Sequence, residues 1–365
     1  MTDYMKNKNI LELCLAHGLG GLEMFSVSCY KHFSQKTNCK IVVVPDQKLD
    51  KYIESEDKYL VKRSKLFPVF PALKLAKYID QNDIDIVHFH WTRDMITAVL
   101  AKVLSKKKPK LIQSRHMGMT RFKDDFYHKW LYSKIDMMHA VTYKVKEQLE
   151  KFIPSVVLPK TEMVYLGTEA LSIDEEVVQE LKDKYKSNGE FIVGIVGRIE
   201  EPKGQYKVIE ALKQLQDKNI KLLIVGSAME EEYLQRLKQE VKELDLEEKV
   251  TFTGFTKNVN EYMQIFDINI LATTNETFGL VVIEAMINKV PVIATNKGGP
   301  LEIIEDGVDG LLFDGSSNDL AVKIEKLFES KELQSSIREN AFQTASKRFD
   351  KDTQLREIYD IIGRI

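Results

Sequence analysis

Short apolar runs alternate with longer amphipathic segments from one end of the chain to the other. The apolar runs predict strands at 10–15, 40–44, 84–89, 110–113, 138–141 and 163–165, and again at 191–196, 221–225, 250–253, 268–271, 290–294 and 310–313. Segments with helical spacing separate most of them, including 22–33, 208–217, 230–244, 259–266 and 318–330. Such alternation is typical of parallel sheets that are covered by helices on both faces.

This pattern predicts an α/β fold class with two doubly wound, Rossmann-like domains. A chain of 365 residues exceeds what one hydrophobic core usually holds. An acidic helix at 173–185 precedes the second set of strands, so we expect the domains to span 1–170 and 171–348. The last segment, 349–365, is predicted to be a helix with no strand after it, and we expect it to pack back on the first domain.

The composition, with 44% apolar and 30% charged residues, is typical of a soluble globular protein. The three cysteines, Cys14, Cys29 and Cys39, lack metal-ligand spacing and indicate reduced thiols of a cytosolic protein. The first residues lead directly into a strand, which argues against a secretory signal, and no window approaches the ~18 apolar residues of a membrane span. We therefore expect a cytoplasmic protein.

The net charge of −2 hides an asymmetry between the two halves of the chain. Residues up to 170 carry a net charge of about +9 and the remainder about −11. A basic half on an otherwise acidic protein indicates an anionic partner, meaning a membrane surface, a phosphorylated glycan or nucleic acid. A solvated helix end explains the run at 106–110 equally well. The basic residues concerned are Lys106, Lys107, Lys108, Lys110, Arg115, Arg121, Lys123 and Lys129.

Two glutamates, Glu276 and Glu284, stand at the two ends of an otherwise uncharged run. Glu276 follows the predicted strand at 268–271, and Glu284 lies in a predicted helix at 280–288 that is apolar on nearly every side. A carboxylate in such a helix costs several kcal/mol unless something hydrogen-bonds to it. Both acids face the carboxyl end of a sheet, where open α/β folds bind ligands. The structural alternative is one capping glutamate and one partner for a buried arginine.

The turn at 18–21 follows the first strand and opens a helix, as a phosphate-binding turn does. Gly20 and Gly21 indicate that something approaches the backbone here. Glu23, however, replaces the third glycine of the dinucleotide fingerprint, which disfavours a nicotinamide dehydrogenase.

The first loop of the second half carries Arg198 and Lys203, five residues apart around a turn. Arginine offers a planar fork to phosphate oxygens and lysine a point charge, so together they suit a diphosphate. An exposed turn with incidental charges is the alternative. A further glycine pair at 298–299 is interpreted mostly as architecture, although it would also admit a ligand.

Histidines lie near the carboxyl ends of two predicted strands in the first half. His88 and His90 alternate and therefore share one face, but no third ligand of suitable spacing appears, and we expect no metal. His90 is interpreted instead as a pocket residue. Arg115 and His116 follow another strand at the same edge of the sheet.

Taken together, these residues resemble the retaining glycosyltransferases of family 4, which have the two-domain GT-B fold. The resemblance is strong over 190–315 and thinner over the first half. It implies two Rossmann-like domains that face each other across a cleft. The motifs that carry it are Gly20-Gly21-Leu22-Glu23, Gly197-Arg198 with Lys203-Gly204, Glu276-Thr-Phe-Gly-Leu with Glu284-Ala, Gly298-Gly299-Pro300-Leu301-Glu302, and Asp306-Gly307 with Gly310-Leu311-Leu312-Phe313.

The resemblance also implies roles on the donor side. Arg198 and Lys203 would neutralise the diphosphate of a nucleotide-sugar, Glu284 would accept hydrogen bonds from the ribose, and Glu276 would hold hydroxyls of the transferred sugar. The base would lie near Gly226 and the loop that contains Gly254 and Phe255. The backbone amides that would meet sugar and phosphate belong to Phe278, Gly279 and Leu280.

In the first domain, the resemblance implies that Gly20 and Gly21 admit the diphosphate and the acceptor, and that His116 contacts the sugar at the reaction centre. His90 and Arg115 would lie on the acceptor side. The donor would be a UDP-, GDP- or ADP-sugar, with no metal and no other cofactor. The acceptor would be a glycan or a lipid-linked glycan of the bacterial envelope, such as lipopolysaccharide or capsule, handled at the inner membrane face.

Three other functions fit parts of the sequence. A glycosidase needs two carboxylates around the scissile bond, but Glu276 and Glu284 project from one loop and helix, and the cations would then be idle. A nucleotide-sugar epimerase or hydrolase of the same fold would act without an acceptor. A nucleic-acid-binding module rests only on the basic run at 106–129, and we expect no nucleic acid partner.

Overall fold

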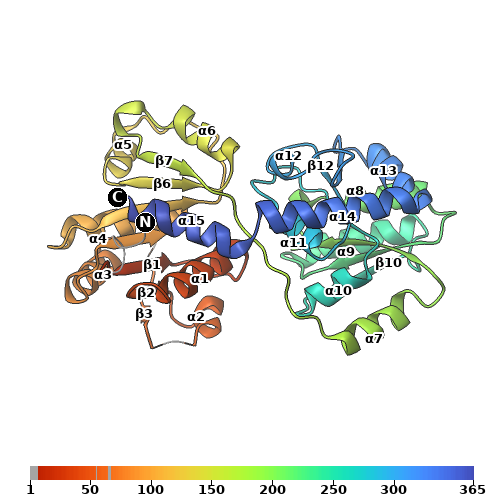
Figure 1. Cartoon of the computed structure of the whole chain (residues 1–365), viewed down its shortest axis with the longest axis horizontal. Coiled ribbons are helices and arrows are strands. Elements are labelled where there is room, and N and C mark those ends of the chain that lie inside the picture. Colours follow the sequence, from red (N-terminus) through yellow and green to blue (C-terminus); the bar gives the residue numbers. More distant parts are fainter. Residues whose placement is uncertain (1–6, 55, 65–66) are drawn as a thin grey trace. The chain divides into compact units, whose positions relative to one another are not determined.

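The computed structural model describes residues 7–54, 56–64 and 67–365. The first six residues, on which the expectation of no secretory signal depends, lie outside that part. The chain forms two α/β units, each with its own sheet (Figure 1). One holds the described residues up to Leu166 together with Asp352–Ile365, and the other holds Gly167–Lys351.

The first unit contains a seven-stranded parallel sheet with the order β3-β2-β1-β4-β5-β6-β7. Its strands are β1 (Ile10–Cys14), β2 (Cys39–Val43), β3 (Lys58–Leu60), β4 (Ile86–Phe89), β5 (Lys110–Arg115), β6 (Met137–Ala140) and β7 (Lys160–Met163). Its helices are α1 (Gly21–Ser34), α2 (Lys48–Tyr52), α3 (Val69–Gln81), η1 (Thr92–Asp94), α4 (Met95–Leu104), α5 (Phe126–Tyr132), α6 (Tyr143–Phe152) and η2 (Ser155–Val157).

The second unit contains a six-stranded parallel sheet with the order β10-β9-β8-β11-β12-β13. Its strands are β8 (Phe191–Val196), β9 (Ile220–Val225), β10 (Val250–Gly254), β11 (Ile268–Leu271), β12 (Val292–Thr295) and β13 (Leu311–Phe313). Its helices are α7 (Glu175–Tyr185), η3 (Glu201–Lys203), α8 (Gln205–Gln214), α9 (Glu231–Glu243), α10 (Val259–Ile265), α11 (Leu280–Ile287), α12 (Pro300–Ile303), α13 (Ser317–Glu329) and α14 (Lys331–Arg348).

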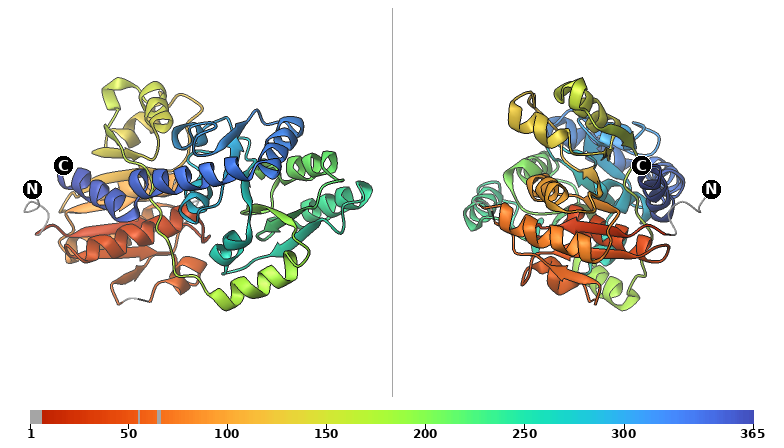
Figure 2. Two further views of the ribbon diagram at one scale, coloured as in Figure 1. Left: turned by 45° about the vertical axis from the view of Figure 1, so that its right-hand side comes forward. Right: turned by 90° about the vertical axis from the view of Figure 1, so that its left-hand side faces the viewer.

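The last helix, α15 (Lys351–Gly363), lies with the first unit except at its first residue (Figure 2). The ring of Tyr359 packs against Phe33 of α1, with ring centroids 5.3 Å apart. The ammonium group of Lys36 lies 5.1 Å from the centroid of the same Tyr359 ring. None of the helices in the described part of the chain is long and apolar enough to span a bilayer.

Strand order decides where ligands can approach each sheet. In both units the order reverses beside the first strand, between β1 and β4 and between β8 and β11. The loops that leave the carboxyl ends of such a strand pair run to opposite sides, which opens a crevice at that edge. The turn at 18–21 and the loop after β4 lie at this position in the first unit. The loops at 197–204 and 272–279 lie there in the second.

The apolar pattern did not predict β3 or α14. The three residues of β3 are all half-buried, so the strand has no apolar face to recognise. Over its 18 residues, α14 buries only Ile337, Ala341 and Ala345, an apolar stripe too narrow to stand out. The strand expected at 163–165 lies instead at Lys160–Met163.

Gly194 in β8 provides a test of the packing in the second unit. A Cβ added there would lie 2.1 Å from a ring carbon of Phe266, which is buried. Overpacking a core typically costs about 1–3 kcal/mol, so Gly194→Ala should lower the free energy of unfolding by at least about 2 kcal/mol in urea denaturation.

Gly189→Asn serves as the matched control for Gly194→Ala. Gly189 has φ of 71° and no atom within 4 Å of an added Cβ, and asparagine tolerates this left-handed conformation. The control should change the free energy of unfolding by less than about 0.5 kcal/mol. Equal effects of the two substitutions would contradict the packing described here.

Candidate functional site

Three glycines follow neighbouring strands at the carboxyl edge of the second sheet. The amide of Gly197 donates to the carbonyl of Val225 at 2.9 Å, and the amide of Gly226 donates to the carbonyl of Gly254 at 3.0 Å. A Cβ on Gly226 would lie 1.9 Å from the carbonyl oxygen of Gly197. Gly226 is therefore required by the close packing of the protein's own backbone. Phe255, which follows Gly254, is strongly exposed.

The loop after β8 is fastened to the loop after β11. Gly204 adopts φ of 72°, and a Cβ there would lie 2.4 Å from the carbonyl oxygen of Ala272. The amide of Thr274 donates to the carbonyl of Pro202 at 3.0 Å. This close approach places Lys203 beside Glu276, and its Nζ atom forms an ion pair with Oε2 of Glu276 at 3.2 Å.

Glu276 is held by its surroundings at both its backbone and its side chain. Its Oε1 atom accepts a hydrogen bond from the amide of Thr277 at 3.2 Å. A Cβ on Gly298 would lie 2.1 Å from the carbonyl oxygen of Glu276, and one on Gly299 would lie 2.2 Å from that of Phe278. The two glycines therefore admit this loop, which supports their interpretation as architecture.

Arg198 points to a different carboxylate from Lys203. Its guanidinium donates to Oε1 of Glu200 at 2.9 Å, and its side chain is 60% exposed. The structure thus brings Lys203 and Glu276 together and leaves Arg198 at the surface of the same loop. Whether both cations meet a diphosphate stays a prediction.

Glu284 lies on α11, which begins after Gly279 with φ of 103°. The residue keeps some exposed surface, but loss of water around its carboxyl raises its pKa. No hydrogen bond or ion pair reaches this carboxyl from the residues that the structure describes. The alternative of a partner for a buried arginine therefore fails for Glu284. An unpaired, desolvated carboxyl is a good acceptor for ligand hydroxyl groups.

The start of α11 presents its backbone rather than its side chains. Phe278 is buried, and its ring lies 6.0 Å from that of Phe349 between centroids. In the first turn, the amide of Val282 donates to the carbonyl of Gly279 at 2.9 Å, whereas the amides of Leu280 and Val281 precede the first bonds of the helix and carry its partial positive charge. An anion at this end would be stabilised.

In the first unit, Gly20 precedes α1 in an extended conformation with φ of −137°, and Gly21 is its first residue. The amide of Gly20 donates to Oε2 of Glu23 at 3.0 Å. A Cβ on Gly20 would lie 3.4 Å from the same oxygen, an ordinary contact. The protein's own packing does not demand glycine at this position.

Arg115 contacts other parts of the protein, and its expected place on the acceptor side stays a prediction. The side chain is buried, and its guanidinium donates to the carbonyls of Met117 at 2.7 Å and Gly118 at 3.2 Å and to Oγ1 of Thr92 at 2.8 Å. It ties the loop after β5 to η1 after β4. Its role is to shape these loops, and burial lowers its pKa.

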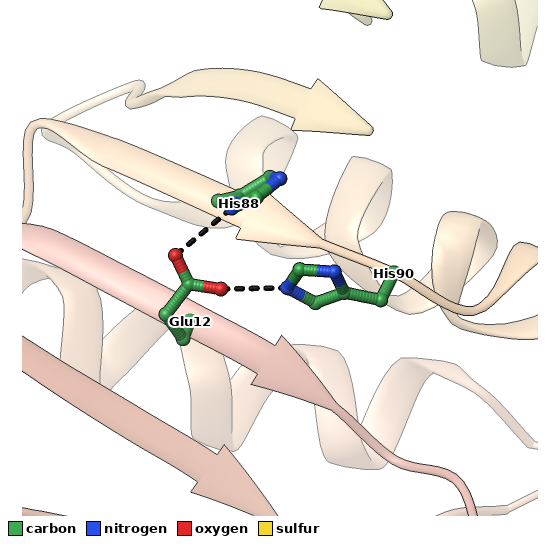
Figure 3. A group of neighbouring side chains, drawn as sticks. All are labelled: Glu12, His88 and His90. Carbon is green, nitrogen blue, oxygen red and sulfur yellow. Dashed lines mark hydrogen bonds and ion pairs between the residues drawn. The ribbon is translucent and has the colours of Figure 1, made fainter. Parts of the chain in front are cut away.

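His90 is likewise enclosed, with 1% of its surface exposed, and its expected place in an acceptor pocket stays a prediction. Its Nε2 atom lies 2.6 Å from Oε2 of Glu12, and Nδ1 of His88 lies 2.9 Å from Oε1 of the same carboxylate (Figure 3). Glu12 and His88 are direct partners in the register of β1 and β4. Sequence reasoning missed Glu12, although a charge in the middle of a buried strand was a usable signal.

The contacts continue across the sheet. His88 Nε2 lies 2.8 Å from Oγ of Ser114, which lies 2.7 Å from Nδ1 of His139. His139 Nε2 donates to the carbonyl of Val164 at 2.7 Å. The hydrogen bonds from His90 through Glu12 to the carbonyl of Val164 number five. The three imidazoles, if neutral, and the Ser114 hydroxyl provide only four protons for them, because an ionised carboxylate provides none. One further proton completes this chain of bonds, and that proton cancels the charge of the buried carboxylate.

The same geometry bears on metal binding. Glu12, His88 and His90 bring three ligand atoms within 4.8 Å of one another, so Glu12 is the third candidate ligand that the sequence did not reveal. Both carboxylate oxygens, however, are at hydrogen-bond distance from the histidine nitrogens. These bonds satisfy the cluster with protons, and a structural zinc site needs a fourth ligand.

His116 lies next to this cluster at the carboxyl end of β5. The ring of Phe25 packs edge-on against His116 at 4.9 Å and against His90 at 5.5 Å between centroids, and the two histidine rings are 5.9 Å apart. Burial, followed by the neighbouring histidines and Arg115, lowers the pKa of His116 well below its usual value. It is a neutral ring at physiological pH.

Comparison with known proteins gives two matching family models. Residues 19–168 match Glycosyltransferase Family 4, and residues 177–344 match Glycosyl transferases group 1. The chain is 29% identical to N-acetyl-alpha-D-glucosaminyl L-malate synthase of Bacillus anthracis over 79% of this chain and 77% of that protein. It is 25% identical to the capsular polysaccharide biosynthesis glycosyltransferase CapM of Staphylococcus aureus over 89% and 90%.

Among solved structures, the HepE protein of Anabaena in complex with UDP and glucose matches with a TM-score of 0.86. It is 22% identical and covers 98% of this chain and 100% of its own. Likeness at this level shows the fold. The two parallel-sheet units are those of the GT-B architecture, as the resemblance implied.

The buried histidines predict an acid-sensitive first unit. Burial lowers the pKa of His90 to about 4 and that of His139 to about 3. Burial opposes the charge of Glu12, but the charges and hydrogen bonds of His88 and His90 prevail and lower its pKa. Below about pH 6.5 these histidines bind protons in the unfolded chain but stay neutral in the folded protein. The free energy of unfolding should therefore fall by on the order of 2 kcal/mol or more from pH 7 to 5.

Below about pH 4.5, protonation of Glu12 in the unfolded chain adds to this loss. Urea denaturation at each pH measures both steps. His139→Gln should flatten the fall between pH 7 and 5, whereas His17→Gln, at an exposed position, should not. A wild-type profile that is flat over this range would contradict the burial of these rings.

Proposed function

Because the chain belongs to the group 1, family 4 glycosyltransferases, we propose that it moves a hexose from a nucleoside-diphosphate sugar to a hydroxyl of a glycan or lipid-linked acceptor, with retention of configuration. The observation that carries this proposal is the cluster at the switch point of the second sheet. There the paired Lys203 and Glu276 lie on loops that the backbone holds together, and the unpaired Glu284 follows on α11.

The diphosphate of the donor would meet the cations of the loop after β8. The Lys203 ammonium has three protons, so it can bind a phosphate oxygen while it keeps its contact with Glu276. Arg198 is exposed and paired only with Glu200 among the described side chains, so its planar fork is available. The start of α11, at Gly279 and Leu280, adds backbone amides for the same anion.

The carboxylates would recognise the two sugars of the donor. Glu284 has no protein partner in the described part of the chain, and ribose hydroxyls would supply the hydrogen bonds that its desolvated carboxyl lacks. Glu276 is held in place by Thr277 and Lys203 and would accept from hydroxyls of the transferred hexose. The base would lie along Gly226, Gly254 and Phe255.

The chemical step would be a front-face displacement at the anomeric carbon. The bond between that carbon and the phosphate oxygen breaks through an oxocarbenium-like transition state, and the acceptor oxygen forms the new bond on the same face. The proton of the acceptor hydroxyl goes to the departing phosphate oxygen. Arg198 and Lys203 would stabilise the charge that develops on the nucleoside diphosphate, which is the main catalytic contribution in this scheme and requires no metal.

The first unit would bind the acceptor. The packing around Gly20 leaves room for a side chain, and a ligand that approaches the backbone would account for glycine at this position. Gly21 continues that turn into α1. His116, at the carboxyl end of β5, would contact the sugar at the reaction centre. The matching capsular relative supports a place in bacterial envelope polysaccharide synthesis, in the cytoplasm or at the inner face of the membrane.

The surface of the first unit suggests how a lipid-linked acceptor is reached. Phe122, Phe126 and Tyr127 are exposed, Phe126 by 87%, and basic residues at 121, 123 and 129 lie among them. Aromatic rings beside cations suit the interface of an anionic membrane. The run at 106–110 contributes less, because Lys107 and Lys110 form ion pairs with Asp83, Asp85 and Asp136.

Arg198→Ala tests the transferase assignment. After thermal-shift screening of UDP-, GDP- and ADP-sugars identifies the donor, kcat/KM for acceptor-dependent nucleotide release should fall at least about 100-fold in this variant. Arg236→Ala is the matched control, because Arg236 is also 60% exposed and paired with a glutamate of the second unit. It should keep near-normal turnover.

Near-normal turnover of the Arg198→Ala variant would contradict the proposed role of this residue. Release of free sugar into water without acceptor would identify a hydrolase, and conversion of the donor sugar without acceptor would identify an epimerase. Either result would replace the transferase proposal.

Membrane association predicts binding to vesicles that contain phosphatidylglycerol. At low salt the protein should co-sediment with them, and binding should weaken as salt screens the charges. Replacing Phe122 and Phe126 by Ser should reduce binding, whereas Val322→Ser, at an exposed apolar position of the second unit, should not. Failure of the wild-type protein to bind at low salt would refute this surface as a membrane contact.

A further inference from the structure

Glu12 constrains the proton position on His90. Its Oε2 atom lies 2.6 Å from Nε2 of His90, and both groups are fully enclosed. The other oxygen faces His88 at 2.9 Å. With neutral imidazoles, the bond that needs the additional proton is the one between Glu12 and His88, so Oε2 of Glu12 remains an acceptor. Nε2 of His90 therefore carries the proton, and its Nδ1 atom is a bare acceptor. This Nδ1 atom is buried and has no hydrogen-bond partner in the structure.

His116, like His90, has one buried ring nitrogen without a hydrogen-bond partner. The residue as a whole is half-buried, and of its two ring nitrogens only Nε2 is enclosed without a partner. Buried polar atoms are almost always satisfied, either directly or through an ordered water. The two orphan nitrogens belong to neighbouring rings whose centroids are 5.9 Å apart, and one water between these rings would give both nitrogens a partner.

Phe25 fixes this pair of rings. It packs edge-on against both, at 5.5 Å from His90 and 4.9 Å from His116 between centroids. The titratable groups around His116 are His88, His90, His139 and Arg115, and none of them offers its Nε2 atom a hydrogen bond in the described structure. Among these four groups, only His90 has a buried ring nitrogen that is left without a hydrogen-bond partner and can accept a proton from Nε2 of His116.

We propose that His90 is a positioning residue that selects the tautomer of His116. Glu12 holds the proton of His90 on Nε2, and the bare Nδ1 of His90 draws the proton of His116 to its inner nitrogen through one bridging water. The other ring nitrogen of His116, Nδ1, is then an acceptor for a hydroxyl group at the edge of the first sheet. The chemical class of its ligand is a sugar or acceptor hydroxyl, a step that rests on the proposed transferase function.

The tautomer can be measured without any substrate. In protein labelled with ¹⁵N-histidine, long-range ¹H–¹⁵N correlation at pH 7 reports which ring nitrogen carries the proton, and single variants assign the seven histidines. The expected result is one tautomer of His116 with the proton on Nε2. A proton on Nδ1 of His116 in the wild-type protein would overturn the proposal, whatever the reaction proves to be.

His90→Gln separates positioning from folding. The glutamine amide nitrogen reaches the place of Nε2 and can still donate to Glu12, but the side chain has no acceptor at the place of Nδ1. The expected result is a folded protein whose His116 shows a mixture of tautomers. Turnover should fall about tenfold, the value of one neutral hydrogen bond, with donor affinity unchanged. His32→Gln, on α1 and in ring contact with Phe33, is the matched control and should change neither readout.

A double-mutant cycle with His116→Ala distinguishes action through His116 from general damage. If His90 acts through His116, then His90→Gln should cost nothing further in the His116→Ala background. Additive losses would show a merely structural role and overturn the proposal. Stoichiometric metal in the purified wild-type protein, lost in Glu12→Gln, would also overturn it, because a metal on Nε2 of His90 would displace the proton that defines the tautomer.

Discussion

Backbone packed directly on backbone is the constraint on which the second unit's ligand edge depends. Gly204 lies against the carbonyl of Ala272, and Gly298 lies against that of Glu276, at distances that exclude any Cβ. The first contact joins the loops after β8 and β11, where the strand order reverses, and the second joins the loops after β11 and β12. The result is that Lys203 and Glu276 meet at 3.2 Å although 73 residues separate them. The charges are placed by glycines that themselves carry no chemistry.

At the corresponding edge of the first unit, a buried carboxylate has to be stabilised. Glu12 is a carboxylate with no access to water, and the protein stabilises it with two histidines and a hydrogen-bonded chain that ends at the carbonyl of Val164. Such a chain is rigid, because any displaced member leaves a buried polar group unsatisfied. It therefore forms a fixed support beneath His116. The carboxyl edge of the second sheet is organised by backbone contacts, and that of the first sheet by a continuous chain of side-chain hydrogen bonds.

Sequence reasoning succeeded where the signal was local. Alternating apolar runs identified both sheets, and the charge of Glu284 in an apolar helix identified a carboxyl that has no partner among the described residues. It missed contacts whose partner came from another strand. His90 and Arg115 follow strands at the carboxyl edge, but the groups that contact their side chains are distant in the chain. β3 escaped notice because none of its three residues is fully buried.

The sequence by itself determined the fold class, the division into two α/β units and the motifs of the family, because periodicity and glycine-bearing turns are properties of consecutive residues. Only the tertiary structure decided which groups face one another. Strand register set Glu12 opposite His88, and loop packing set Lys203 beside Glu276 and left Arg198 to Glu200. Pairing across a parallel sheet depends on register and on backbone approach, and neither is written in the spacing of residues along the chain.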